Sequence, residues 1–172
     1  MNAAATSPSS TVVDIRKLWT VFKSPDGEQV VHRDLDLHLD RGEVLSLVGG
    51  SGTGKTVLLR QILGLQKPTK GAVEVLGRAP GELSAAGAAN VGMLFQHGAL
   101  FSAFSVLENI AFPLRELKLL PDELIRNAAL VKLQMVGLEP QHANKSPSDL
   151  SGGMIKRVAL ARALIMDPPL LL

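Results

Sequence analysis

The sequence predicts an α/β fold with an N-terminal antiparallel sheet, then a buried strand, a glycine-rich loop and a helix, and finally an α-helical region. Residues 12–39 alternate apolar and polar side chains in two runs around the turn sequence Ser24-Pro25-Asp26-Gly27, which is typical of a half-exposed sheet. Residues 44–48 form a nearly continuous apolar run that ends in glycines, as in a strand buried on both faces. Helical spacing of apolar residues dominates the second half of the chain.

The remaining elements are predicted as follows, in chain order. A helix is predicted over residues 56–63, where Gly64 can end it in the left-handed conformation. Short strands are predicted over residues 72–76 and 91–95, with a loop of small residues at 85–89 between them. Pro121 begins a helix that ends at Gly137. Its apolar face is predicted to consist of Leu124, Ala128, Val131 and Met135.

The last predicted helix begins near Ser151 and ends before Pro168 and Pro169. Ile155, Val158 and Ala159 are expected to face inward. The basic residues are expected to form a solvated face, and the alternative is a role near the nucleotide or a partner. Those basic residues are Lys156, Arg157 and Arg162. Residues 170–172 then begin another buried strand.

Composition excludes several classes of protein. The 172 residues are 46% hydrophobic and 20% charged, which excludes wholesale disorder and collagen-like or coiled-coil composition. No apolar run is long enough for a spanning helix, and residues 1–10 do not resemble a signal peptide, so we expect a cytoplasmic chain. The absence of cysteine and the scattered positions of four histidines exclude disulfides and a zinc-site pattern. A net charge of +2 is too small to indicate a nucleic-acid partner.

Residues 1–11 are expected to be a disordered tail, and residues 12–172 to form the domain.

The strongest motif lies between the predicted strand at 44–48 and the following helix. Residues 49–56, here called the glycine loop, read Gly49-Gly50-Ser51-Gly52-Thr53-Gly54-Lys55-Thr56 and satisfy the pattern G-x-x-x-x-G-K-[ST]. Such a loop turns backbone N–H groups toward phosphates at the positive end of a helix. Lys55 would reach the β- and γ-phosphates, and the Thr56 hydroxyl would bind Mg²⁺. The alternative is a glycine-rich turn that only caps a helix. The loop indicates a nucleoside triphosphate site, without choosing among kinases, GTPases and ATPases.

A second anion-binding motif precedes the last predicted helix. In the segment Leu150-Ser151-Gly152-Gly153-Met154, here called the signature segment, a hydroxyl and exposed backbone N–H groups meet a helix N-terminus. The alternative is an ordinary helix cap. With the basic residues that follow, the segment resembles the LSGGQ signature of ATP-binding-cassette (ABC) ATPases, with Met154 in place of glutamine. The resemblance implies a P-loop NTPase cassette core, ATP and Mg²⁺ as cofactors, and a homodimer in which Ser151, Gly152 and Gly153 of one copy cover the nucleotide of the other.

The same resemblance implies roles for three further residues. Gln96 corresponds to the glutamine that senses the γ-phosphate and Mg²⁺, so the implied catalytic residues are Lys55 and Gln96 and the implied Mg²⁺ ligands are Thr56 and Gln96. Phe22 stands where the family carries the aromatic residue that stacks on adenine, and Val31 where a small apolar residue packs beside it. Trp19 is a rival for the stacking role, and plain core or hairpin packing is the alternative for Phe22 and Val31.

Two segments, residues 93–101 and 106–116, are similar to the ATPases of Mla/Mce-type phospholipid transporters of bacteria. The methionine at position 154 of the signature segment is similar to that branch too. This closer resemblance implies a transmembrane permease as partner, no nucleic acid, and a location on the inner face of the cell membrane. The apolar residues at 98–101 and 104 would be either a docking surface for the permease or the core of a helical subdomain at about 97–148.

In the family, Asp and Glu should follow the strand that begins at Leu170, and a switch histidine should come later; the sequence ends at Leu172. We therefore expect a C-terminally truncated cassette, without its last strands, that binds ATP and hydrolyses it weakly or not at all. The rival functions are an ATPase that serves a small-solute transporter, a soluble cassette ATPase of translation or DNA repair, and a non-hydrolysing nucleotide-binding fragment.

Overall fold

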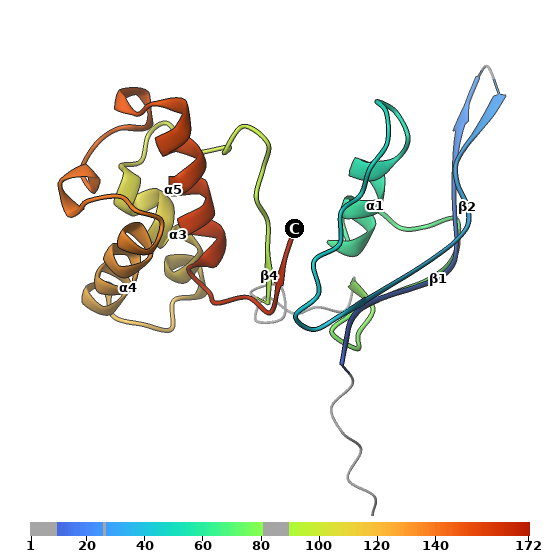
Figure 1. Ribbon diagram of the computed structural model, residues 1–172, viewed down its shortest axis with the longest axis horizontal. Helices are drawn as coiled ribbons and strands as arrows, with labels where there is room; N and C mark the ends of the chain where they lie inside the picture. The colour runs from blue at the N-terminus through green and yellow to red at the C-terminus, as the bar shows by residue number, and fades with distance from the viewer. Residues whose placement is uncertain (1–9, 26, 81–89) are drawn as a thin grey trace, which may run out of the picture. The chain divides into compact units, whose positions relative to one another are not determined.

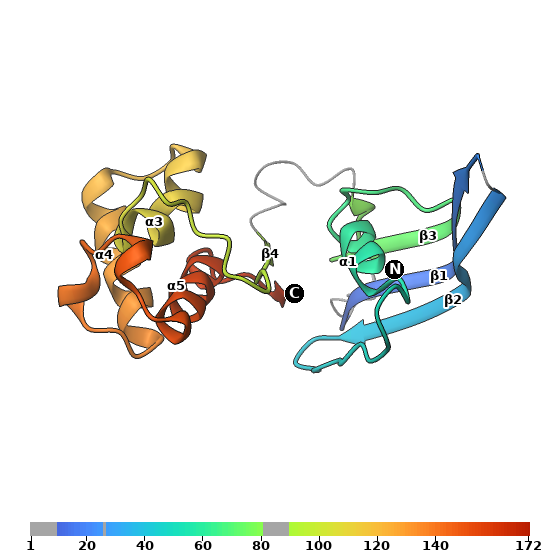
Figure 2. The ribbon, with the colours of Figure 1, turned by 90° about the horizontal axis from the view of Figure 1, so that it is seen from above.

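The computed structural model describes residues 10–25, 27–80 and 90–172. These residues form two compact units, one within residues 1–83 and one within residues 84–172. Figures 1 and 2 show that the described part of the first unit combines a sheet with a helix and that the described part of the second is mainly helical. The predicted loop at 85–89 lies outside the described residues, as does the predicted tail except for Ser10 and Thr11; Thr11 begins the first strand.

The first unit contains the predicted antiparallel sheet. Its three strands are β1 (Thr11–Ser24), β2 (Gly27–Asp40) and β3 (Lys70–Val75), in the order β2-β1-β3. Ser24 pairs with Gly27 at the end of the β1–β2 hairpin, which confirms the predicted turn. The strand predicted at 72–76 is confirmed as β3 and pairs antiparallel with the other edge of β1.

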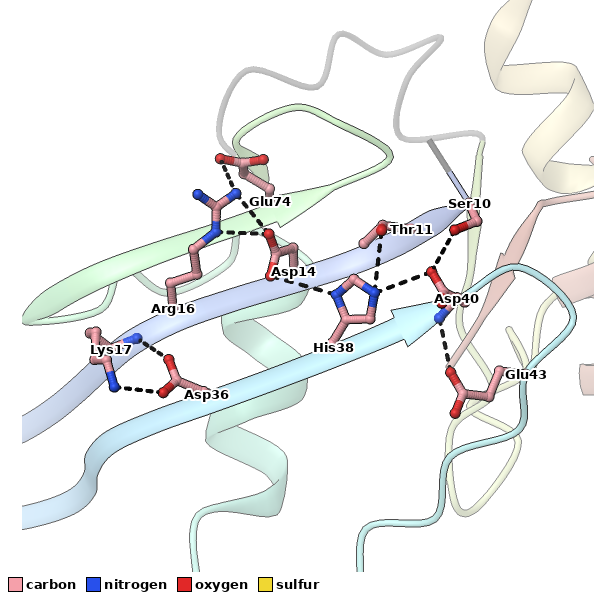
Figure 3. Close-up of polar contacts among 10 residues, drawn as sticks. All are labelled: Ser10, Thr11, Asp14, Arg16, Lys17, Asp36, His38, Asp40, Glu43 and Glu74. Atoms are coloured by element: carbon pink, nitrogen blue, oxygen red, sulfur yellow. Dashed lines mark hydrogen bonds and ion pairs between the residues drawn. The ribbon is translucent and has the colours of Figure 1, made fainter. Parts of the chain in front are cut away.

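The sheet has one apolar and one charged face, as its alternating sequence predicts. Val13, Ile15 and Leu18 of β1 and Val73 and Val75 of β3 are buried. Figure 3 shows the polar contacts, where Arg16 contacts Asp14 and Glu74, and Lys17 contacts Asp36. The hydrogen bonds from Lys17 lower the pKa of the Asp36 carboxyl. Exposed ion pairs of this kind contribute little to stability, so the apolar face holds the sheet in place.

The prediction of a buried strand at residues 44–48 is wrong. Residues 43–50 form no strand, and Val44 and Val48 are 92% and 93% exposed. A continuous apolar run becomes a buried strand only where neighbouring strands supply hydrogen bonds and other elements cover both faces. Within the described ranges, no strand pairs with this segment.

The second unit contains helices α3 (Val106–Leu117), α4 (Asp122–Met135) and α5 (Gly152–Leu164). Two 3-10 turns, Pro140–His142 and Pro147–Asp149, connect α4 to α5. Strand β4 (Val91–Gly92) pairs parallel with β5 (Leu170–Leu171). The predicted strand 91–95 is therefore shorter than expected, although the Leu94 N–H still donates to the Leu172 carbonyl. The strand predicted to begin at Leu170 is present as β5, but only Leu170 is buried and Leu171 is exposed.

Helix α1 (Lys55–Ile62) and helices α4 and α5 confirm three predicted helices, and Gly64 has the left-handed φ of 73° expected after α1. Helix α3 was not predicted as an element. Its N-terminus has a complete capping box between Ser105 and Glu108, and Pro113 lies inside it. None of the helices in the described parts of the chain is long and apolar enough to cross a membrane.

Helix α4 buries a largely different face from the predicted one, of which only Ala128 packs against the core. Leu124 and Val131 are each 54% exposed, and Met135 is also exposed, while Ile125 and Leu133 are buried. Ala129 is buried between them, so the buried residues follow the spacing i, i+4, i+8. Apolar residues lie on two faces of α4, and the packing of α3 and α5 selects the face that becomes core.

We expect Leu133→Ala to lower the free energy of unfolding by about 2–5 kcal/mol, because it leaves a cavity in this core. Leu124→Ala, the same substitution on the exposed face, should change it by less than about 0.5 kcal/mol. Urea unfolding followed by circular dichroism measures both values. Equal losses in the two variants would contradict the assignment of the buried face.

Candidate functional site

The glycine loop leads directly into α1 in the first unit. Gly54 is the N-cap residue, with a φ of 93°, and its carbonyl accepts the first helical hydrogen bond from the Leu58 N–H at 2.9 Å. No side chain of the described residues caps this helix, so its first N–H groups remain available to an anion. The loop therefore ends in a helix N-terminus suited to phosphate.

The Lys55 ammonium lies inside the curl of the loop. Its Nζ donates to the carbonyls of Gly49 and Gly50, each at 2.6 Å, and to Thr53 Oγ1 at 3.2 Å. Phosphate oxygens accept stronger, charge-assisted hydrogen bonds than neutral carbonyls do. A phosphate bound here would therefore compete for the lysine and draw its ammonium outward.

Apart from the buried Gly54, the other residues of the loop are open to solvent. Ser51, Gly52 and Thr56 are exposed, and Gly52 has a φ of 80°. An exposed hydroxyl at Thr56, on the first turn of α1, suits a hard cation such as Mg²⁺. The loop thus fits the phosphates and the metal that its motif indicates.

Val31 is one of the two residues expected to contact the adenine base. The structure places it against the glycine loop. Val31 Cγ1 lies 2.5 Å from the position that a Cβ on Gly54 would take. Phe22 lies on β1 opposite Gln29 and is 41% exposed. The rival Trp19 already has the Arg33 guanidinium over its ring, 5.8 Å from the centroid. Phe22 is therefore the more accessible of the two aromatic rings.

The signature segment lies in the second unit, at the start of α5. Ser151 Oγ accepts a hydrogen bond from the Met154 N–H at 3.3 Å. Gly152 and Gly153 are exposed, with open space where a Cβ would stand. The ordinary helix cap is thus present, and it leaves the hydroxyl proton of Ser151 available as a donor.

Gln96 also belongs to the second unit, where it is exposed in a tight turn. The Gly98 N–H donates to the Phe95 carbonyl across this turn at 2.9 Å. Arg162 holds the residues that follow by donating to the carbonyls of Gly98 at 2.7 Å and Ala99 at 2.8 Å. The expected solvated position of Arg162 is wrong, because its side chain is half-buried and this burial lowers its pKa.

Asn109 of α3 is a second residue of structural importance that the sequence analysis missed. It is fully buried. Its Oδ1 accepts from the Phe101 N–H at 2.8 Å, and its Nδ2 donates to the carbonyls of Phe101, Phe104 and Ser105. An asparagine at helical spacing from the apolar residues Val106 and Phe112 is the signal that could have identified it.

Asn109 thereby fixes a cluster of three aromatic rings. Phe101, Phe104 and Phe112 pack with ring centroids 4.8–5.8 Å apart. A mainly apolar cavity of about 450 Å³ adjoins them and is also lined by Phe95 and Pro113. Phe101 is exposed, so the cluster presents apolar surface to solvent.

Comparison with solved structures confirms the predicted fold class, an α/β P-loop cassette core with an N-terminal antiparallel sheet and a helical region. The dimeric post-hydrolysis state of the ATP-binding cassette MJ0796, bound to ADP and Pi, matches with a TM-score of 0.81 and 32% identity, over 92% of this chain and 72% of that one. The family model for ABC transporters matches residues 32–172. The chain therefore belongs to the ABC transporter family.

Two curated relatives extend over nearly the whole chain. It is 43% identical over 168 residues to the intermembrane phospholipid transport system ATP-binding protein MlaF of Haemophilus influenzae, covering 95% of this chain and 62% of that protein. It is 38% identical over 169 residues to the probable ribonucleotide transport ATP-binding protein mkl of Mycobacterium leprae, covering 96% of this chain and 47% of that protein. The chain thus spans less than two thirds of the length of these relatives.

Gly54→Ala should destabilise the first unit by about 1–3 kcal/mol, the usual cost of a left-handed non-glycine residue. The overlap with Val31 adds to this cost. Gly50→Ala is the matched control, because a Cβ there meets nothing within 4 Å and Gly50 has no positive φ. Urea unfolding of both variants measures the difference. A Gly54→Ala protein as stable as Gly50→Ala would contradict this account of the turn.

Proposed function

We propose that the chain is the ATP-binding part of an ABC transporter ATPase and that it binds Mg²⁺-ATP at the glycine loop. The observation that carries this proposal is the uncapped N-terminus of α1 behind Gly54, with the Lys55 ammonium held in the curl before it. Positive charge and unpaired N–H groups converge there on one exposed loop, as the binding of a triphosphate requires.

The residues of the proposed ATP site then have the following roles. Lys55 binds the β- and γ-phosphate oxygens, and backbone N–H groups from Gly49 to Thr56 surround the phosphate chain. Thr56 would hold Mg²⁺, which supplies positive charge that neutralises the phosphates. The role of Gln96 as a further Mg²⁺ ligand stays a prediction from the family resemblance. Val31 and the exposed Phe22 would bind the adenine.

A second copy of the chain is the proposed partner at this site. The exposed Gly152 and Gly153 and the remaining donor of Ser151 are suited to covering a phosphate from the partner's side. The dimeric state of the MJ0796 cassette supports this arrangement. The small net charge of +2 gives no reason to propose a nucleic-acid partner.

A transmembrane permease is the second proposed partner. The Phe101–Phe104–Phe112 cluster and its adjoining cavity offer apolar surface. The cluster follows Gln96 in the sequence. Such a surface suits a helix of a membrane subunit. On this proposal the protein works at the cytoplasmic face of the cell membrane without entering the bilayer.

The proposed cargo is a phospholipid, moved between bacterial membranes. This part of the proposal rests on the 43% identity to MlaF over 95% of the chain. A small-solute transporter is the alternative, and the 38% identity to the ribonucleotide transport protein mkl supports it.

Lys55→Ala should weaken the binding of Mg²⁺-ATP by about ten- to a hundredfold, because a charge-assisted hydrogen bond contributes about 1.5–3 kcal/mol. Lys67→Ala, at an exposed lysine after α1, is the matched control and should bind as the unaltered chain does. Isothermal titration calorimetry measures all three affinities. Unchanged affinity in Lys55→Ala would refute the proposed site.

The cargo is tested with the complete ATPase and its permease in proteoliposomes that contain labelled phospholipid. We expect ATP-dependent removal of the lipid to an acceptor, and no removal with Lys55→Ala. Uptake of a nucleoside or another small solute, with no lipid movement, would support the small-solute alternative instead.

A further inference from the structure

Arg162 of α5 holds the turn that follows Gln96. Its guanidinium donates to the carbonyls of Gly98 at 2.7 Å and Ala99 at 2.8 Å, and it lies over the Phe101 ring, 5.8 Å from the centroid. The donors of a planar guanidinium stand in a fixed fork, so two bonds to neighbouring carbonyls fix both the position and the direction of the turn. Arg162 therefore connects α5 to the cluster of three aromatic rings.

The same turn rests against an earlier part of α5. Gly98 is buried, and a Cβ at this position would lie 2.8 Å from Ile155 Cγ2 and 3.6 Å from Ala159 Cβ. Ile155, Ala159 and Arg162 have the spacing i, i+4, i+7, so they lie on one face of the helix. The Ile155 N–H in turn donates to the Ser151 carbonyl at 2.9 Å. The helix face that carries the turn thus begins at the signature segment.

The turn and the arginine are each held in an unfavourable state. Ala99 has a φ of 46°, in the left-handed region where a residue with a Cβ is strained. Within the described residues, the partners of the half-buried guanidinium are the two carbonyls and the Phe101 ring, with no carboxylate among them. Strain and a desolvated charge without a counter-charge both reduce stability, and they are typical of functional positions. What the contact positions therefore explains it better than the stability that it adds.

We infer that Arg162 is a positioning residue that fixes the permease-docking cluster to the helix carrying the signature segment, so that both move together through its bonds. A helix moves as a rigid rod, and Ser151 lies roughly 16 Å along α5 from Arg162. A shift of the docking turn therefore moves the Ser151 hydroxyl that covers a phosphate of the partner copy.

Such coupling between two sites is reciprocal. If docking of the permease moves the signature segment, a nucleotide bound under that segment must change the affinity for the permease. This inference rests on the proposed dimer and on the proposed docking of the permease at the aromatic cluster.

The test measures the dissociation constant between the complete ATPase and its permease in nanodiscs by microscale thermophoresis. It is measured with and without Mg²⁺-AMP-PNP, an ATP analogue that is not hydrolysed. We expect the nucleotide to tighten the complex of the unaltered protein at least about fivefold, the lower end of ordinary coupling between sites. In Arg162→Met, which has no donors, this ratio should fall below about twofold. Arg162→Lys keeps the charge but not the fork, so its ratio should be intermediate.

Arg157→Met is the matched control. Arg157 belongs to the same helix and also donates to a backbone carbonyl, that of Gly137 at 3.0 Å, which lies outside the turn. This variant should keep the ratio of the unaltered protein.

Amide hydrogen exchange separates positioning from general stability. The Gly98 N–H, which donates to the Phe95 carbonyl, should exchange faster in Arg162→Met than in the unaltered protein. The N–H of Ala129, in the core of the second unit, should exchange at its unaltered rate.

An unaltered ratio in Arg162→Met would overturn the inference. An equal loss in Arg157→Met would do so too, as would equal permease affinities of the unaltered protein with and without nucleotide. If the unaltered protein binds no nucleotide or no permease, the proposed function fails instead, and the Gly98 exchange still decides whether Arg162 holds the turn.

Discussion

The left-handed turn at Gly54 is the constraint on which the rest of the first unit depends. The chain must pass from an open loop to a helix within one residue, and it does so with a φ of 93°. Because glycine has no Cβ, Val31 and His32 of β2 can occupy the space beside it. The sheet and α1 are thus joined at the point where the glycine loop ends, and the orientation of its N–H groups follows from that junction.

The second unit uses a buried and a half-buried polar side chain in a comparable way. Asn109 makes four hydrogen bonds to the backbone of residues 101–105, and Arg162 makes two to Gly98 and Ala99. Irregular backbone needs such partners because no helix or sheet satisfies it. The exposed ion pairs of the β1–β2–β3 sheet in Figure 3 differ, since water competes for each of them. The bonds from the buried Asn109 and the half-buried Arg162, rather than the exposed ion pairs, therefore define the loops.

Sequence reasoning succeeded where the cause of a structure is local. The hairpin turn, α1 with Gly64 after it, and the cap at Ser151 depend on residues that are adjacent in the chain. It missed α3 because Pro113 argues against a helix, although Ser105 and Glu108 form a capping box. It was wrong about the segment at 44–48, because a buried strand needs partners that an apolar run cannot specify by itself.

The sequence by itself determined the chemistry of this protein: a loop with Lys55 and Thr56, a second anion-binding motif at Ser151, and the family to which they point. Only the tertiary structure decided which face of α4 is core, that Arg162 supports a loop, and that Thr20, His32 and Gln61 meet behind Gly54. The physical reason is distance along the chain. Motifs depend on neighbouring residues, whereas burial and buried hydrogen bonds join residues such as Thr20 and Gln61, which are 41 positions apart and come into contact only when the fold forms.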